Sequence, residues 1–178
     1  RWATHGRPHS LNAHPFVKDN CALVHNGIIE NYDELISSFS IDRNNLESET
    51  DTEVIAQLYS KLLTEQTPIE ALMNLFHKIE GTFALAFLVK GSNSIYAARK
   101  GSPLVLGLSN NSKALSSDIL GLPSFVTETI FLEENDIVEI NSSSFSIFNA
   151  KGGEVQREIH PHSTQDDFNT KGNFKHFM

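Results

Sequence analysis

The dipeptide Asn26-Gly27 offers two hydrogen-bond donors suited to catalysis, a side-chain amide and a backbone N–H. It follows a short apolar run at residues 22–24, which we expect to be a buried strand. Asn-Gly is typical of a tight turn, and a turn after a strand can hold such donors rigidly. Rigid donors of this kind can stabilise a developing oxyanion. Taken alone, the dipeptide also fits an ordinary structural turn.

Charged and polar side chains elsewhere could bind a small zwitterion. Four of them crowd into the first five positions: Arg1, Trp2, Thr4 and His5. A guanidinium can bind both oxygens of a carboxylate and a hydroxyl adds a further donor, although a cation-π contact between Arg1 and Trp2 is the alternative. Asp51 could bind an ammonium group. An acidic residue near a helix start also interacts favourably with the helix dipole without any further function.

Histidines raise the alternative of a zinc-dependent hydrolase, because imidazole is a common zinc ligand. The candidate ligands are His5, His9 and His14, with His160 and His162. Spacings of four and five in a loop match no known ligand pattern, so we expect neither a metal site nor a cofactor. The single cysteine, Cys21, precedes an apolar strand. We expect it to pack in the core rather than to act as a nucleophile.

Three helices and seven strands are predicted to position these residues. The helices begin at Asn31, Thr50 and Thr67, each followed three residues later by Glu, and the third should stop near Gly81. Strands are predicted at residues 82–89, 95–98, 104–106, 114–117, 129–132, 137–140 and 145–148. Strands that follow helices indicate an α+β fold. Residues 1–20 show no hydrophobic periodicity, and we expect their backbone to be irregular.

Composition narrows the class of protein. With 178 residues and 39% hydrophobic content, the chain can form one domain, which we place at residues 1–159, followed by a polar linker at 160–178. A net charge of -8 disfavours binding to nucleic acid or an anionic membrane. One cysteine fits a reducing compartment, no apolar run is long enough to span a membrane, and we expect a cytoplasmic protein.

Four motifs, taken in order, resemble the glutaminase domain of the glutamine-fructose-6-phosphate aminotransferase (isomerising) family. They are RWATHG at 1–6, NAHP at 12–15, VHNGIIEN at 24–31 and SETDTEV at 48–54. The likeness continues through ARKGSPLVLG at 98–107 and FLEENDI at 131–137 to KGNFKHFM at 171–178, and so covers nearly the whole chain. Class II amidotransferases that make purine precursors or asparagine are the second alternative.

The resemblance implies an N-terminal-nucleophile hydrolase fold, a four-layer sandwich with two antiparallel sheets between helical layers. It also implies hydrolysis of L-glutamine to glutamate and ammonia through a cysteine thiol. The ammonia would pass to fructose 6-phosphate in a separate isomerase domain to give glucosamine 6-phosphate. The full-length protein would be a homo-oligomer.

Matched positions carry the family's site onto this sequence. Arg1 and Thr4, with the backbone near His5, resemble the clamp for the glutamine α-carboxylate. Trp2 resembles the residue that gates ammonia transfer.

The remaining matches lie further along the chain. Asp51 and the carbonyl of Gly27 resemble the partners of the α-ammonium. Asn26 and the N–H of Gly27 resemble the oxyanion hole. Asn135 stands where the family commonly has Gly, and Asn tolerates a left-handed conformation.

No residue of this sequence matches the family's nucleophile, an N-terminal cysteine upstream of Arg1. The resemblance implies that the first strands of the fold would also lie upstream of Arg1. We therefore expect either part of a longer protein or a remnant that binds glutamine without turnover. The 178 residues alone are expected to be inactive, because an activated nucleophile is required.

Overall fold

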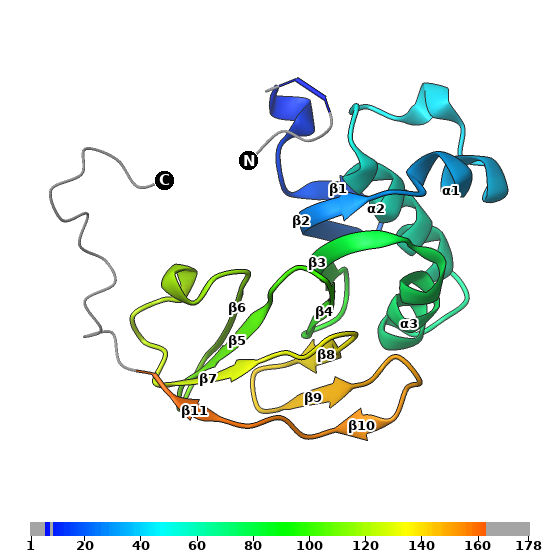
Figure 1. Ribbon diagram of the computed structural model, residues 1–178. Coiled ribbons are helices and arrows are strands. Elements are labelled where there is room, and N and C mark those ends of the chain that lie inside the picture. The colour runs from blue at the N-terminus through cyan, green and yellow to red at the C-terminus, as the bar shows by residue number, and fades with distance from the viewer. Residues whose placement is uncertain (1–5, 8, 163–178) are drawn as a thin grey trace, which may run out of the picture.

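Two antiparallel sheets and three α-helices make up the part of the chain that the computed structural model describes, residues 6–7 and 9–162. The helices lie together against one face of the larger sheet, and the smaller sheet lies beyond its other face (Figure 1). The predicted α+β class with two antiparallel sheets is confirmed. Of the two helical layers expected, the described residues supply one; outside the smaller sheet they form a loop with the short 3-10 helix η3 (Ile119–Gly121).

Every strand pairing is antiparallel within the described residues. The larger sheet has the order β1 (Phe16–Lys18), β2 (Cys21–Ile29), β3 (Gly81–Val89), β4 (Ile95–Lys100), β8 (Ile137–Ile140), β9 (Phe145–Phe148), β10 (Glu154–Val155). The smaller sheet has the order β11 (His160–Pro161), β7 (Glu128–Phe131), β5 (Val105–Leu108), β6 (Lys113–Ser116). The seven strands predicted from the sequence are all present, with ends shifted by two residues at most.

The helices begin where the capping residues indicated. They are α1 (Tyr32–Ser38), α2 (Asp51–Leu62) and α3 (Pro68–Lys78). At the start of α2 the hydroxyl of Thr50 accepts a hydrogen bond from the N–H of Glu53 at 3.4 Å. At the start of α3 the carboxylate of Glu70 accepts from the N–H and hydroxyl of Thr67, and these bonds lower the pKa of Glu70.

Asn31 precedes α1 but makes no capping hydrogen bond with its side chain. Its amide donates to the carbonyl of Lys78, and its side-chain oxygen accepts from the N–H of Glu80, each at 2.9 Å. The side chain therefore ties the end of β2 to the end of α3. A tertiary contact has replaced the local cap that the sequence predicted.

The predicted turn at Asn26-Gly27 is wrong, because both residues lie inside the nine-residue strand β2. Gly27 has φ 139°, and a Cβ placed on it would lie 2.0 Å from the carbonyl oxygen of Thr82 in β3. Gly81 mirrors it across the strand pair, with a Cβ position 2.2 Å from the carbonyl oxygen of Ile28. Glycine is required here by the close approach of two backbones.

The side chains of strand β2 alternate between the two faces of the larger sheet, which have different surroundings. Cys21, Leu23, His25 and Ile29 are buried on the face that α2 covers, whereas Val24, Asn26 and Ile28 are exposed on the opposite face. The burial of Cys21 confirms its predicted place in the core. A second apolar cluster fills the space between the two sheets, with members such as Leu106, Ile130 and Val138.

The segment before the C-terminal residues is also part of the fold. His160 pairs with Thr129, so two residues that the sequence analysis assigned to a linker form β11. Just before β11, the guanidinium of Arg157 donates to both carboxylate oxygens of the fully buried Asp136, at 2.9 and 2.7 Å. Next to it, Asn135 has φ 66°, the left-handed conformation predicted. Residues 163–178 of the predicted linker lie outside the described part.

Candidate functional site

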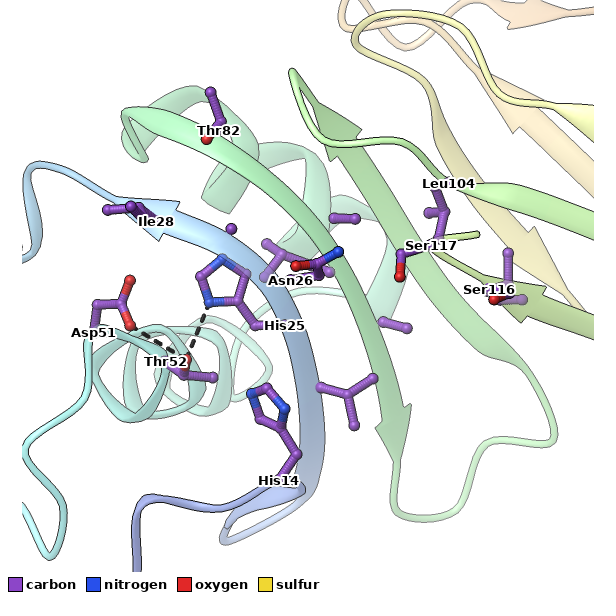
Figure 2. A pocket seen from close by; sticks show the side chains of 16 residues that line it. His14, His25, Asn26, Ile28, Asp51, Thr52, Thr82, Leu104, Ser116 and Ser117 are labelled. Carbon is purple, nitrogen blue, oxygen red and sulfur yellow. Dashed lines mark hydrogen bonds between the residues drawn. The ribbon is translucent and has the colours of Figure 1, made fainter. Parts of the chain in front are cut away.

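A cavity of about 660 Å³ lies between the two sheets, where the open face of β2 meets β3 and the edge strand β6. Its walls are formed by residues from β2 and β3, from the start of α2, and from the region of β5 and β6 (Figure 2). Asn26, Gly27 and Asp51, three of the residues predicted to form the site, line this one cavity.

Asn26 projects from the exposed face of β2 into the cavity, away from α2 (Figure 2). It pairs in register with Ala84 of β3, a small residue that leaves space above the strand. Gly27 follows directly, held by its close approach to Thr82. An amide side chain and a neighbouring backbone unit are therefore presented by a strand that pairs with β3 along its whole length, whereas β1 pairs only with residues 21–23 of β2. Such a support gives little freedom to move, which is what a preorganised donor pair needs.

Asp51 is the first residue of α2 and is 1% exposed, although it lines the cavity. Its Oδ2 accepts a hydrogen bond of 2.8 Å from the N–H of Ile29 at the end of β2. The carboxylate thus joins the helix start to the strand that carries Asn26. A buried carboxylate next to a cavity is suited to binding a cation, since little water competes for it.

Two further cavity residues, His25 and Thr52, were missed in the sequence analysis. Nδ1 of His25 lies 3.0 Å from Oγ1 of Thr52, and that hydroxyl donates to Oδ1 of Asp51 at 3.3 Å (Figure 2). His25 is 8% exposed and Thr52 is 1% exposed. Strand alternation could have indicated His25, because the residue before Asn26 must point to the opposite face, toward the helix.

Arg1, Trp2, Thr4 and His5 lie outside the described residues. Cys21 points to the helix side of β2, where its thiol donates to the carbonyl of Ala56 at 3.5 Å. Burial raises the pKa of this thiol to about 11, with a smaller contribution from Asp19. It is therefore a protonated core group at neutral pH.

The histidines have separate environments. Nδ1 of His9 accepts from the N–H of Leu11, the ring of His14 meets that of Phe16 edge-on at the cavity wall, and His160 contacts Phe131. Within residues 6–7 and 9–162 there is no group of three or more His, Cys, Asp or Glu side chains that could hold a metal ion.

Comparisons with known proteins show the family to which this chain belongs. A family described as the glutamine amidotransferase domain matches residues 7–123, and the chain belongs to this family. The chain is 42% identical over 180 residues to the glutamine--fructose-6-phosphate aminotransferase [isomerizing] of Caulobacter vibrioides. It is 40% identical over 181 residues to the protein of that name from Thermotoga maritima and 40% identical over 180 residues to that of Haemophilus influenzae. Each alignment covers 100% of this chain and 30% of the relative, so the chain spans less than a third of the relatives' length.

Solved structures share the fold at lower identity. The glutamine phosphoribosylpyrophosphate amidotransferase from B. subtilis superposes with a TM-score of 0.60 at 19% identity, covering 79% of this chain and 31% of that one. A class-II glutamine aminotransferase domain protein from Silicibacter pomeroyi gives a TM-score of 0.61 at 20% identity, covering 79% of this chain and 72% of that one. These neighbours confirm the predicted N-terminal-nucleophile type of fold. No helix in the described ranges is long and apolar enough to cross a membrane.

Proposed function

We propose that this domain binds L-glutamine in the cavity between the sheets and releases its side-chain amide as ammonia. The observation that carries the proposal is the presence of Asn26, Gly27 and Asp51 on one cavity. Glutamine needs an anionic partner for its α-ammonium and donors for the oxyanion formed at its side-chain carbonyl. The cavity walls offer one carboxylate and one amide for these two purposes.

In the proposed mechanism, Asp51 and the carbonyl of Gly27 bind the α-ammonium. The amide of Asn26 and the N–H of Gly27 donate to the oxygen of the tetrahedral intermediate, where negative charge develops. The buried Cys21 is unsuited to be the nucleophile, because its thiol is protonated and lies on the helix side of β2. We propose that the nucleophile is a cysteine of the longer protein, as the family resemblance implies.

The relatives' name supports a finer proposal for that longer protein. Identity near 40% over the whole chain with proteins called glutamine--fructose-6-phosphate aminotransferase [isomerizing] favours transfer of the ammonia to fructose 6-phosphate. The clamp for the α-carboxylate would be Arg1 and Thr4 with the backbone near His5, and Trp2 would gate the transfer. We also propose a homo-oligomeric, cytoplasmic enzyme in which the glutaminase domain, predicted at residues 1–159, extends through β11 to Pro161, and the segment after it leads to the isomerase domain.

Paired variants of the full-length protein test the proposal. Asp51→Asn should lower kcat/KM for glutamine by about a hundredfold, because a buried charge pair is broken. Asn26→Ala should lower kcat by roughly a hundredfold and change KM little, because the oxyanion exists only in the transition state. Asp42→Asn, at the exposed start of the 3-10 helix η2 (Arg43–Asn45), and Asn20→Ala, at an exposed turn position, are the matched controls.

Two further measurements separate catalysis from folding. Synthesis from externally supplied ammonia should survive both site variants, since that chemistry belongs to the other domain. Glutamine hydrolysis is normalised to folded protein. Near-normal kinetics with a lowered melting temperature would reduce Asp51 to a helix-start residue and remove Asn26 from the site.

A further inference from the structure

We propose that Thr52 is a positioning residue for glutamine recognition: its hydroxyl joins His25 to Asp51 and holds the Asp51 carboxylate in the orientation that receives the substrate ammonium. This inference rests on the proposed function and adds a residue to it. Thr52 is not a catalytic residue, because it acts through Asp51.

The first step of the argument is the fixing of both Asp51 oxygens. Oδ2 accepts from the backbone N–H of Ile29 at 2.8 Å, and Oδ1 accepts from the Thr52 hydroxyl at 3.3 Å. One donor belongs to the sheet and the other to the helix. A carboxylate held by a donor on each oxygen has a defined plane, and this plane fixes the direction from which a substrate ammonium can approach.

The second step is the direction of the hydrogen-bond chain. A hydroxyl has one proton, and here it is donated to Asp51. The same oxygen can then only accept from Nδ1 of His25, 3.0 Å away. The protons therefore run from His25 through Thr52 to Asp51, and each donor polarises the next.

The third step concerns charge. The Thr52 hydroxyl is a neutral donor, so it orients Asp51 without cancelling the negative charge that an ammonium group would need. Asp51 and Thr52 are each 1% exposed, which limits competition from water. The contact matters most for a ligand that carries a positive charge at this point and little for one that lacks it.

The experiment uses two substitutions of the full-length protein that differ in one group. Thr52→Val keeps the shape of the buried side chain and removes the hydroxyl, whereas Thr52→Ser keeps the hydroxyl. We expect Thr52→Val to raise KM for glutamine about tenfold, the scale of one hydrogen bond to a charged group, with kcat changed less than about threefold. Thr52→Ser should stay within about threefold of wild type in both constants.

A second substrate separates positioning from folding. Glutaramate, which is glutamine without its α-amino group, has no ammonium to place against Asp51. Thr52→Val should lower the ratio of kcat/KM for glutamine to that for glutaramate by about tenfold. Because both substrates are measured on one preparation, the fraction of folded protein cancels. Thr52→Ala provides the same ratio if the valine variant accumulates poorly.

The outcomes test the role of Thr52 separately from the proposed function. If Asp51→Asn lowers the ratio and Thr52→Val leaves it at the wild-type value, the role of Thr52 is refuted and the proposed function stands. Equal losses toward both substrates would likewise make Thr52 a packing residue. If the wild-type protein does not hydrolyse glutamine, the proposed function itself is overturned.

Discussion

Asn12 and Glu49, from segments far apart in the sequence, are joined by hydrogen bonds in both directions. The side-chain oxygen of Asn12 accepts from the N–H of Glu49 at 3.0 Å, and its amide donates to a carboxylate oxygen of Glu49 at 3.5 Å. The same amide donates to the carbonyl of Arg7 at 2.9 Å. The segment from Arg7 is thereby fixed to the loop that leads into Asp51.

Asn12→Asp should disturb this junction because Asp cannot donate to Arg7 and places a second negative charge beside Glu49. Asn12 is 6% exposed, so the lost bonds are not replaced by water. We expect the free energy of unfolding to fall by about 2 kcal/mol in urea titrations. The matched control is Asn111→Asp at an exposed position. Equal unfolding midpoints for the two variants would contradict the structural role of Asn12.

Gly27→Ala should be far more damaging than the same substitution at Gly91. Both glycines have positive φ, but a Cβ at Gly27 would lie 2.0 Å from the Thr82 oxygen, whereas Gly91 has nothing within 4 Å. Gly91→Ala then costs only the left-handed strain, about 1 kcal/mol. Gly27→Ala adds a backbone clash, for a total of roughly 3 kcal/mol or more. Similar urea midpoints would show that β2 and β3 can move apart freely.

Cys21 makes the stability depend on pH in the alkaline range. The thiol has a pKa of about 11 in the folded chain against an ordinary value of 9.0. A raised pKa means that its contribution is complete below pH 9 and is lost as the pH rises from 9 through 11. The loss should approach about 2 kcal/mol.

Two measurements check the behaviour of Cys21. Unfolding in urea at several alkaline pH values should show this loss, and Cys21→Ala should lack that part of it. Iodoacetamide should modify the native thiol slowly at pH 8 and rapidly in urea, because the thiolate reacts and the folded site disfavours it. Rapid modification of the native protein would mean that Cys21 is accessible and ionised.

The features predicted best were those that depend on residues close together in the sequence. Thr50 and Thr67 mark the starts of α2 and α3 because a cap and its partner lie within one helical turn. Short strands such as β10 and β11 were missed. Two residues give no periodic pattern, and their pairing partners Phe148 and Thr129 are what define them.

The errors at the site have a similar cause, because they concern contacts between residues that are far apart in the sequence. Asn-Gly favours turns locally, but the reason for Gly27 is the carbonyl of Thr82, which only the fold brings close. The link from His25 through Thr52 to Asp51 depends on the packing of α2 on β2. Motif resemblance predicted that Asn26, Gly27 and Asp51 belong to one site, and the structure adds the cavity that all three line.

Because the two faces of β2 have different surroundings, the register of this strand determines which side chains lie on each face. Adjacent residues of a strand face opposite ways, so inserting or deleting one residue before Asn26 would exchange the faces. The amide would turn under α2 and the imidazole would leave Thr52 for the opposite face of the strand, even if every backbone pair with β3 re-formed. Such a change in length would preserve the strands of the sheet but would remove the Asn26 amide from the proposed site. Loops of the smaller sheet, such as residues 109–112 between β5 and β6, should accept the same change far more readily.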